Sequence, residues 1–384
     1  MNAKQELNRM RAPDERASEE RAWTVVRSAY RDRPAKVTRR PRWRLAIVPT
    51  LVAAVTAVAL SPAGATIGRA IKQALGVQHA ARALFSLPAP GSLLLSGPGG
   101  TWTVAADGST RHIGAWRDAS WSPHGRYIAV ARGDQLAVLD PHGAVLWTVA
   151  RPAVGHPEWF SPSGYRLAYL SAHQLRIIAG DGTGDHLLAS RVAPVAPAWR
   201  PGHPYQVAYT DSHGAVVVRD ADSGQIVWTA HAGTVRSLDW SADGSRLLVL
   251  TRIRARIYGN GRMIAQPTMS AGTLILDGAL SPDGRQLALV RDGVAQDVAV
   301  ATLNSRRPAL RPVLSGPGLR QAVWAPDSRW LLTSWPAADQ FVFVRTAGGP
   351  RIVAVSRIAQ QFGTPSPARG FPQLGGWCCT TPRG

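Results

Sequence analysis

The stretch "SWSPHGRYIAVARGDQLAVLDPHGAVLWTVA" (residues 120–150) alternates strand-forming runs with turn residues. In its Ser-Pro-His-Gly tetrad (122–125), proline presets φ for a turn and glycine takes the position that requires a positive φ. Strand signals follow at 127–130, 135–140 and 143–150. Together with a short strand that ends at Trp121, the stretch predicts a unit of four antiparallel strands.

Five further segments repeat this pattern, and each has a large apolar residue, here called the blade anchor, beside its turn. The six anchors are Trp121, Phe160, Trp199, Trp240, Leu280 and Trp324, separated by 39, 39, 41, 40 and 44 residues. A period near 40 with strands throughout is typical of β-propeller blades. Because an isolated four-stranded sheet would expose both faces, we expect the anchors to pack between neighbouring blades.

The two ends of the repeat region complement each other. Residues 92–114 contain the second, third and fourth strands of a unit whose first strand is missing, and "QLGGW" (373–377) supplies a first strand with Trp377 as a seventh anchor. Joining them removes the free edges of an open array. The predicted fold class is therefore an all-β, seven-bladed propeller over 92–378, closed by the N- and C-terminal strands and followed by a tail (379–384).

The tetrads "SPDG" (281–284), "SADG" (241–244) and "SPHG" (122–125) resemble those of the periplasmic TolB protein and of the propellers of prolyl-oligopeptidase-like enzymes, a broad group related to tryptophan-aspartate repeat proteins. The resemblance covers about 92–378 and implies the fold but no activity. Two departures, "RPGH" (200–203) and Leu280 in place of an aromatic anchor, weaken single blades.

Before the propeller, 24 consecutive residues without a charge (45–68) are long enough to cross a bilayer as a helix. The preceding "RRPRWR" (39–44) favours a cytoplasmic N-terminal segment (1–44). The sequence thus predicts a single-pass membrane protein with a linker (69–91) and an extracytoplasmic propeller. The alternative is a cleaved secretory signal, for which Ala63 and Ala65 offer a small-x-small site.

Residues 15–32 have Trp23, Val26 and Tyr30 at helical spacing and predict an amphipathic helix in front of the span. It would either lie on the inner leaflet or dock a cytoplasmic partner. This layout resembles that of membrane-anchored anti-sigma regulators, although residues 1–78 lack the zinc-binding His and Cys of many such proteins.

The chain has a formal net charge of +20. Residues 1–44 hold 13 Lys and Arg against 6 Asp and Glu, a net charge of +7, which leaves +13 for the remainder. These later charges form no run of five or more, so no nucleic-acid stripe is indicated. We expect a surface that attracts an anionic lipid or envelope polymer.

Signals for chemistry are weak. The chain contains no Gly-x-Ser-x-Gly elbow, no His-Glu-x-x-His and no phosphate-binding loop, and its ten histidines fall mostly in turns. The stretch "AGDGTGDH" (179–186) is better explained as a turn than as a calcium loop. We therefore predict no catalytic residue, cofactor, metal or small-molecule substrate.

The favoured function is a non-catalytic module that binds a protein or an envelope polymer through one face of the ring. The alternative is a transmembrane signalling regulator, with the propeller as sensor and the N-terminal helix as docking segment. The abundance of Ala, Arg and Gly suggests a bacterial source.

The only cysteines, Cys378 and Cys379, follow the seventh anchor directly. Adjacent cysteines in an oxidising compartment either form a vicinal disulfide that stiffens the turn or stay buried thiols. Both alternatives remain open at this point.

Overall fold

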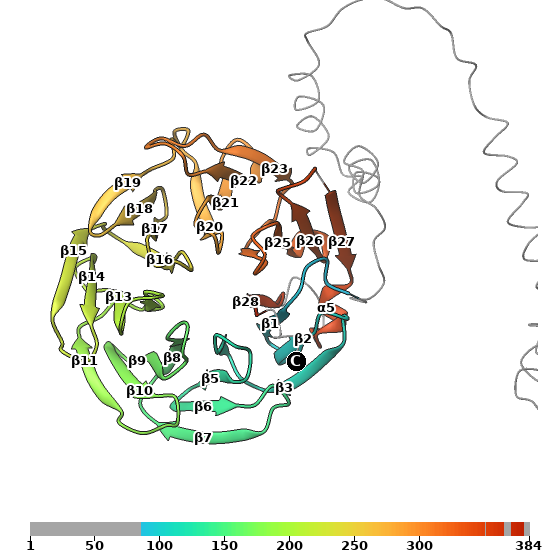
Figure 1. Ribbon diagram of the computed structural model, residues 1–384. Helices are drawn as coiled ribbons and strands as arrows, with labels where there is room; N and C mark the ends of the chain where they lie inside the picture. The colour runs from blue at the N-terminus through green and yellow to red at the C-terminus, as the bar shows by residue number, and fades with distance from the viewer. Residues whose placement is uncertain (1–85, 350, 365–369, 380–384) are drawn as a thin grey trace, which may run out of the picture. The chain divides into compact units, whose positions relative to one another are not determined.

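The computed structural model describes residues 86–349, 351–364 and 370–379. These residues form seven four-stranded antiparallel sheets arranged in a ring around a central axis (Figure 1). The seven blades and their four-stranded antiparallel architecture are as predicted. In each blade the first strand lies nearest the axis and the fourth forms the rim.

The blades are numbered around the ring, with strands given from the axis outward. Blade 1 comprises β28 (Gln373–Cys378), β1 (Ser92–Gly97), β2 (Gly100–Val104) and β3 (Thr110–Gly114); blade 2, β4 (Asp118–Trp121), β5 (Ile128–Arg132), β6 (Gln135–Leu139) and β7 (Val145–Ala150); and blade 3, β8 (Val154–Trp159), β9 (Arg166–Ser171), β10 (Gln174–Ala179) and β11 (His186–Ser190). Blade 4 comprises β12 (Ala198–Trp199), β13 (Gln206–Thr210), β14 (Ala215–Asp220) and β15 (Ile226–His231); and blade 5, β16 (Val235–Trp240), β17 (Leu247–Thr251), β18 (Ala255–Gly259) and β19 (Arg262–Ala265). Blade 6 comprises β20 (Leu274–Leu280), β21 (Gln286–Asp292), β22 (Gln296–Thr302) and β23 (Arg311–Ser315); and blade 7, β24 (Ala322–Trp324), β25 (Trp330–Trp335), β26 (Gln340–Arg345) and β27 (Arg351–Ser356).

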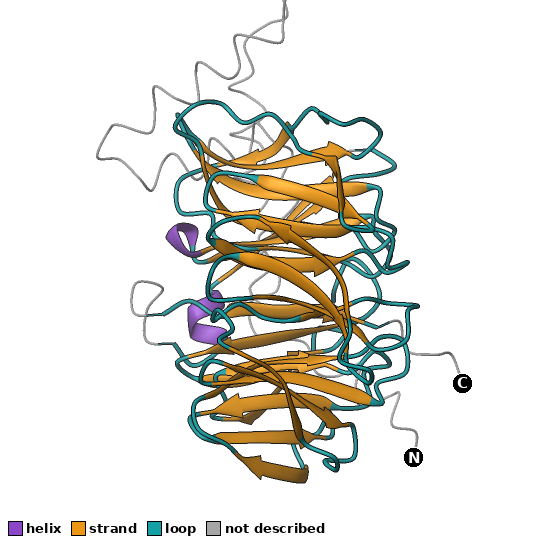
Figure 2. Ribbon diagram, turned by 90° about the vertical axis from the view of Figure 1, so that its left-hand side faces the viewer, coloured by secondary structure: helices purple, strands orange, loops and turns teal. Residues whose placement is uncertain are grey.

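Because successive strands run in opposite directions, the turns divide between two faces of the ring. The tetrads and the turns between third and fourth strands open on one face, here called the tetrad face. The turns between second and third strands and the connections between blades open on the other, here called the loop face. The 3-10 helix η1 (Pro336–Ala338) and the helix α5 (Ile358–Gln361) belong to the loop face and lie on the same side of the disc (Figure 2).

The core consists of seven apolar clusters, and each cluster is shared by two neighbouring blades. Middle strands are therefore buried on both faces, as in Leu287–Val290 of β21, whereas the rim strand β7 alternates between exposed and half-buried residues. No blade in the described region has a core of its own, so stability depends on the contact between blades.

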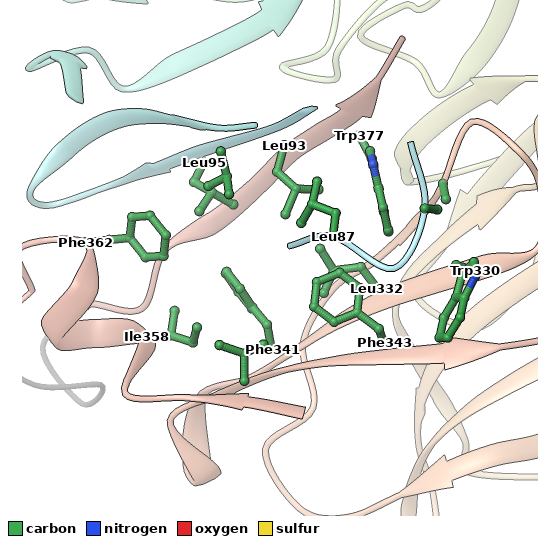
Figure 3. Close-up of a cluster of buried hydrophobic side chains, with 14 residues drawn as sticks. Leu87, Leu93, Leu95, Trp330, Leu332, Phe341, Phe343, Ile358, Phe362 and Trp377 are labelled. Carbon is green, nitrogen blue, oxygen red and sulfur yellow. The ribbon is translucent and has the colours of Figure 1, made fainter. Parts of the chain in front are cut away.

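The ring closes where β28 pairs with β1, with Trp377 opposite Leu93. Figure 3 shows the cluster beside this junction, in which the Trp377 indole meets the Phe343 ring edge-to-face at 5.6 Å between centroids. Phe362, just after α5, packs edge-to-face on Trp102 of β2 at 5.7 Å. The inserted segment before β28 thus adds aromatic side chains to the closing interface.

The departure "RPGH" in the fourth tetrad is explained by Arg200, whose side chain is only 5 % exposed. Its guanidinium donates to Gly244 O at 2.7 Å, to Asn260 Oδ1 at 2.7 Å and to Gln206 Oε1 at 3.1 Å, and it lies 5.0 Å from the centroid of the Trp240 ring. Burial lowers the pKa of Arg200 from its usual value. Because three of these contacts lie in blade 5, the residue connects two blades.

The predicted helices before the propeller must be corrected. Within 86–349, 351–364 and 370–379, no helix is long and apolar enough to cross a membrane, and α5 and η1 have four and three residues against the roughly 20 that a span needs. The predicted amphipathic helix (15–32) and apolar span (45–68) lie outside the described residues. A stretch of about 20 residues without charge is necessary for a membrane-spanning helix, but it is not sufficient for one. The fold class is therefore corrected to a propeller with no membrane-spanning helix among the described residues, and the predicted single-pass, extracytoplasmic localisation is withdrawn.

Deleting residues 373–384 should destabilise the whole ring, because it removes β28 and the buried Trp377. We expect a loss of at least about 3–5 kcal/mol and a drop in Tm of at least about 6 °C, measured by circular dichroism. Deletion of 380–384 alone, which leaves β28 in place, is the control. Equal Tm values for the two deletions would contradict closure by the tail.

Arg200→Met should cost about 2–4 kcal/mol in urea unfolding, because it leaves buried acceptors in blade 5 without a donor. Arg200→Lys should also destabilise, since an ammonium cannot reproduce the planar set of donors. The exposed Arg285, beside the tetrad of blade 6, provides the control: Arg285→Met should stay within about 0.5 kcal/mol of the parent. If Arg200→Met left the free energy of unfolding unchanged, this contact between blades would be dispensable.

Candidate functional site

The structure places most of the predicted anchors at the ends of the inner strands. Trp121, Trp199, Trp240, Leu280 and Trp324 are the last residues of β4, β12, β16, β20 and β24, and Trp377 is the next-to-last residue of β28. Trp121 is half-buried, and the other five are less than 9 % exposed. Leu280 fills the same place as the tryptophans.

In blade 3 the strand ends at Trp159, not at the predicted anchor Phe160. Trp159 pairs with Leu167 of β9, as Trp199 pairs with Val207. Phe160 takes the place that Ser122 has in blade 2, packing edge-to-face on Trp199 at 5.3 Å between ring centroids. The turn after it is one residue longer than in blade 2, and alignment on the tetrad therefore shifted the anchor by one position.

The anchors also form a hydrogen-bond ladder between blades. The indole Nε1 atoms of Trp199, Trp240 and Trp324 donate to the backbone oxygens of Glu158, Ala198 and Ala279 at 2.9, 3.2 and 3.1 Å, respectively. In each case the acceptor is the next-to-last residue of the inner strand in the preceding blade. A tryptophan here therefore contributes a directed contact in addition to its buried surface.

Polar side chains on the inner strands form a second ladder, which the sequence analysis did not identify. Asp118 accepts from His156 N at 3.1 Å, Asp239 from Leu280 N at 2.8 Å and Asp277 from Ala322 N at 3.0 Å. At the closing junction, Gln321 Oε1 accepts from Leu374 N at 3.0 Å. Each acceptor therefore connects its own blade to the inner strand of the next blade.

Glu158 occupies a comparable place, one residue before the end of β8. Among the described residues, no hydrogen bond or ion pair involves its carboxyl group. Burial, together with the charges of Asp239 and Asp118, raises the pKa of Glu158 to about 8. Burial also raises the pKa of Asp239 to about 7 and that of Asp277 to about 6, even though both accept backbone hydrogen bonds. The inner strands thus hold several carboxyl groups whose ionisation is unfavourable.

A pocket of about 820 Å³ lies on the tetrad face between blades 2 and 3. Tyr127, Trp147, Trp159 and Tyr165 are among its lining residues, and the Tyr127 ring stacks on Trp159 at 6.3 Å between centroids. The Trp147 indole donates to Gly180 O in the next blade at 3.0 Å. The pocket is therefore an aromatic recess whose walls are themselves contacts between blades.

The acidic turn at 179–186 is occupied by protein groups. Asp181 accepts from the backbone N and the hydroxyl of Thr183, and Asp185 binds Arg151, Arg176 and the Tyr169 hydroxyl. Across the described residues, no group of three or more His, Cys, Asp or Glu is arranged to hold a metal. Both aspartates therefore act as structural acceptors.

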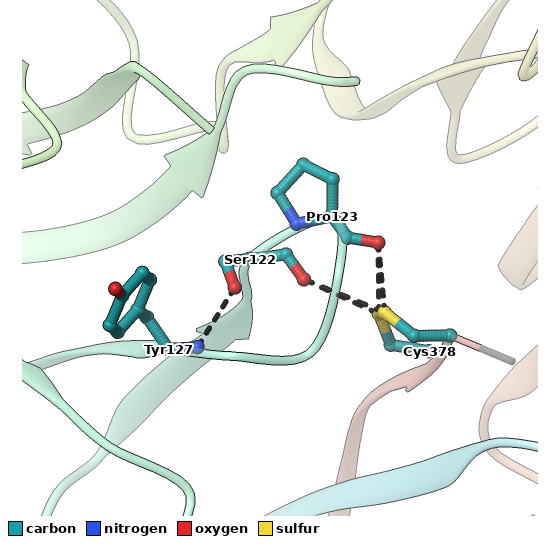
Figure 4. Close-up of a disulfide and its surroundings, with 5 residues drawn as sticks. Ser122, Pro123, Tyr127 and Cys378 are labelled. Atoms are coloured by element: carbon teal, nitrogen blue, oxygen red, sulfur yellow. Dashed lines mark hydrogen bonds between the residues drawn. A yellow bond between two sulfur atoms is a disulfide. The ribbon is translucent and has the colours of Figure 1, made fainter. Parts of the chain in front are cut away.

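Cys378 and Cys379 form a disulfide between adjacent residues at the end of β28 (Figure 4). The Cys379 sulfur lies 3.0 Å from Pro123 O, and both sulfurs lie 3.5 Å from Ser122 O. The pair therefore packs against the tetrad of blade 2, which also lines the pocket. The predicted docking residues Trp23, Val26 and Tyr30 lie outside the described residues and stay a prediction.

Comparison with known proteins supports the same fold. Residues 224–250, which span β15, β16 and part of β17, match the family model WD40: WD domain, G-beta repeat. No curated protein matches the chain. The chain thus contains a WD40 repeat and folds as a seven-bladed propeller.

Three solved structures illustrate the likeness. Hsv2 of Kluyveromyces lactis has a TM-score of 0.52 and 15 % identity over 69 % of this chain and 93 % of that one. The Cps50 (Swd1) β-propeller domain of Myceliophteria thermophila has a TM-score of 0.50 and 14 % identity over 65 % and 94 %. The C-terminal WD40 domain of Sif2 has a TM-score of 0.53 and 14 % identity over 69 % and 83 %. Identities this low show a shared fold alone.

Glu158→Gln should stabilise the protein at high pH. Because the folded-state pKa is raised from about 4.5 to about 8, the folded protein holds this proton more tightly than the unfolded chain. Wild-type stability therefore falls as pH rises through this window. We expect a gain of about 1–3 kcal/mol for Glu158→Gln at pH 9 and none at pH 4, measured by urea unfolding.

Asp107→Asn is the matched control for this pH effect. Hydrogen bonds from Ser109 lower the pKa of the exposed Asp107, so neutralising it should give no gain at pH 9. A Glu158→Gln variant with wild-type stability at pH 9 would contradict the raised pKa.

Proposed function

We propose that the protein is a non-catalytic scaffold that binds a partner protein through the loop face of its propeller. The observation that carries the proposal is that inner-strand carboxylates are used as acceptors between blades: those of Asp118, Asp239 and Asp277 accept backbone N–H groups of the next blade. Groups engaged in this way stiffen a ring and do not supply an acid, a base or a nucleophile. A WD40 repeat further supports an interaction role.

A partner protein is favoured over an anionic envelope polymer because the loop face also offers exposed aliphatic side chains. Ile253 is 53 % exposed and Val294 is fully exposed, each at a turn between second and third strands. Aliphatic surface of this kind suits apolar side chains of a polypeptide. The TolB-like character of the tetrads remains part of the proposal, since it implies the same scaffold.

The test is affinity purification of the full chain with quantitative mass spectrometry. We expect a defined partner whose recovery falls by about fivefold or more when Ile253 and Val294 are both changed to serine. The pair Leu146→Ser and Tyr165→Ser, also exposed but near the tetrad face, should leave recovery unchanged. Equal loss with both pairs, or turnover of glycan or peptide libraries by the purified chain, would overturn the proposal.

A further inference from the structure

The loop face carries a set of exposed arginines. Eight of them have exposed side chains and, within the described parts of the chain, no hydrogen bond or ion pair from the guanidinium: Arg117, Arg132, Arg191, Arg236, Arg252, Arg254, Arg320 and Arg357. All eight lie in turns between second and third strands, in connections between blades, or at strand ends that meet these loops. The tetrad face also carries exposed arginines, among them Arg126, Arg285 and Arg329, so the two faces differ mainly in how many aspartates accompany the arginines.

Several aspartates of this face are engaged elsewhere. Asp297 pairs with Arg291, and three others bind backbone groups. Asp134 accepts from Ala153 N at 2.8 Å, Asp211 accepts from two backbone N–H groups of its own turn, and Asp339 accepts from Ala359 N at 2.8 Å. Three of these carboxylates are thus turned toward the backbone. Eight aspartates lie instead in turns of the tetrad face, namely Asp107, Asp140, Asp181, Asp220, Asp222, Asp243, Asp283 and Asp327.

Three of the arginines adjoin the ring axis. Arg117 precedes β4, Arg236 is the second residue of β16, and Arg320 stands two residues before β24. Their inner strands belong to blades 2, 5 and 7, so the three cations are distributed around the axis (Figure 1). Backbone hydrogen bonds fix two of them, from Arg117 N to Ala131 O and from Arg320 N to Ser334 O. Among the described residues, no hydrogen bond or ion pair holds the three guanidinium groups, although the positive charge of Arg236 acts on Asp277 and counteracts the rise of its pKa.

The geometry points to an acidic polypeptide segment, rich in Asp and Glu, as the ligand of this face, and we propose that it lies across the ring axis between Arg117, Arg236 and Arg320. The inference rests on the proposed function and specifies its partner. Guanidinium groups bind carboxylates through paired hydrogen bonds, and separate carboxylates can be spaced to match separate arginines. The aliphatic Ile253 and Val294 provide apolar contacts on the same face.

A nucleic acid fits this face less well. The large exposed apolar residues of the described loop face are aliphatic, whereas sequence-tolerant binding of single strands uses aromatic side chains on which bases stack. A polypeptide needs no such stacking surface.

The test measures fluorescence anisotropy of a labelled 15-residue Glu/Asp peptide with the purified full chain. The variant Arg117→Glu, Arg236→Glu, Arg320→Glu should weaken binding by about tenfold or more and reduce its salt dependence. The control variant Arg126→Glu, Arg285→Glu, Arg329→Glu carries the same change in charge on exposed arginines of the tetrad face and should stay within about threefold of the parent. Both variants keep the basic N-terminal segment, so its contribution cancels.

Three outcomes would overturn the inference: no binding of the peptide, equal weakening by the two variants, or tighter binding of a single-stranded oligonucleotide of equal charge. Thermal unfolding of each variant, expected within a few degrees of the parent, confirms that the ring is intact. If the peptide fails while partner recovery still depends on Ile253 and Val294, the scaffold role stands and the acidic partner is wrong.

Discussion

The contact between neighbouring blades is the interaction on which the rest of the structure depends. Every apolar cluster of the described region draws its side chains from two blades, so a single sheet would leave both of its faces in water. An open row of blades would still expose two such faces. Pairing of β28 with β1 removes them, and a short C-terminal strand therefore bears on the stability of the whole ring.

Polar contacts near the axis add direction to this apolar packing. Indole donors and carboxylate acceptors on the inner strands reach the backbone of a neighbouring blade, which fixes the height at which blades meet. Glu158 departs from the pattern, because its carboxyl group takes no such partner and its pKa is raised to about 8. Burial also raises the pKa of Asp239 to about 7 and that of Asp277 to about 6, but these two carboxyl groups each accept a hydrogen bond from the next blade, which Glu158 does not.

The sequence was sufficient to predict the blades but not the contacts between them. The spacing of the anchors and the tetrads predicted seven units and the closing role of Trp377, because these signals are local and repeated. Phe160 was assigned in place of Trp159, since a turn that is one residue longer shifts the register without changing the motif. Arg200 was taken as a weakness of its blade, although its partners Gly244 and Asn260 lie 44 and 60 residues away. The disulfide packs on Pro123, at a separation of 256 residues, and no local pattern could show that neighbour.

The same distinction explains why the basic face escaped the sequence analysis. Its arginines are scattered over 240 residues and form no run, yet the meander returns each second-to-third turn and each interblade loop to one side of the ring. Side chains that are remote in the chain are in this way collected on a surface whose backbone is held by packed blades. Such a surface loses little backbone freedom on binding, so the main entropic cost is that of ordering the arginine side chains. A partner binds most tightly when its carboxylates already match the spacing of these arginines. Selectivity between partners then depends on where their charges lie more than on how many charges they carry.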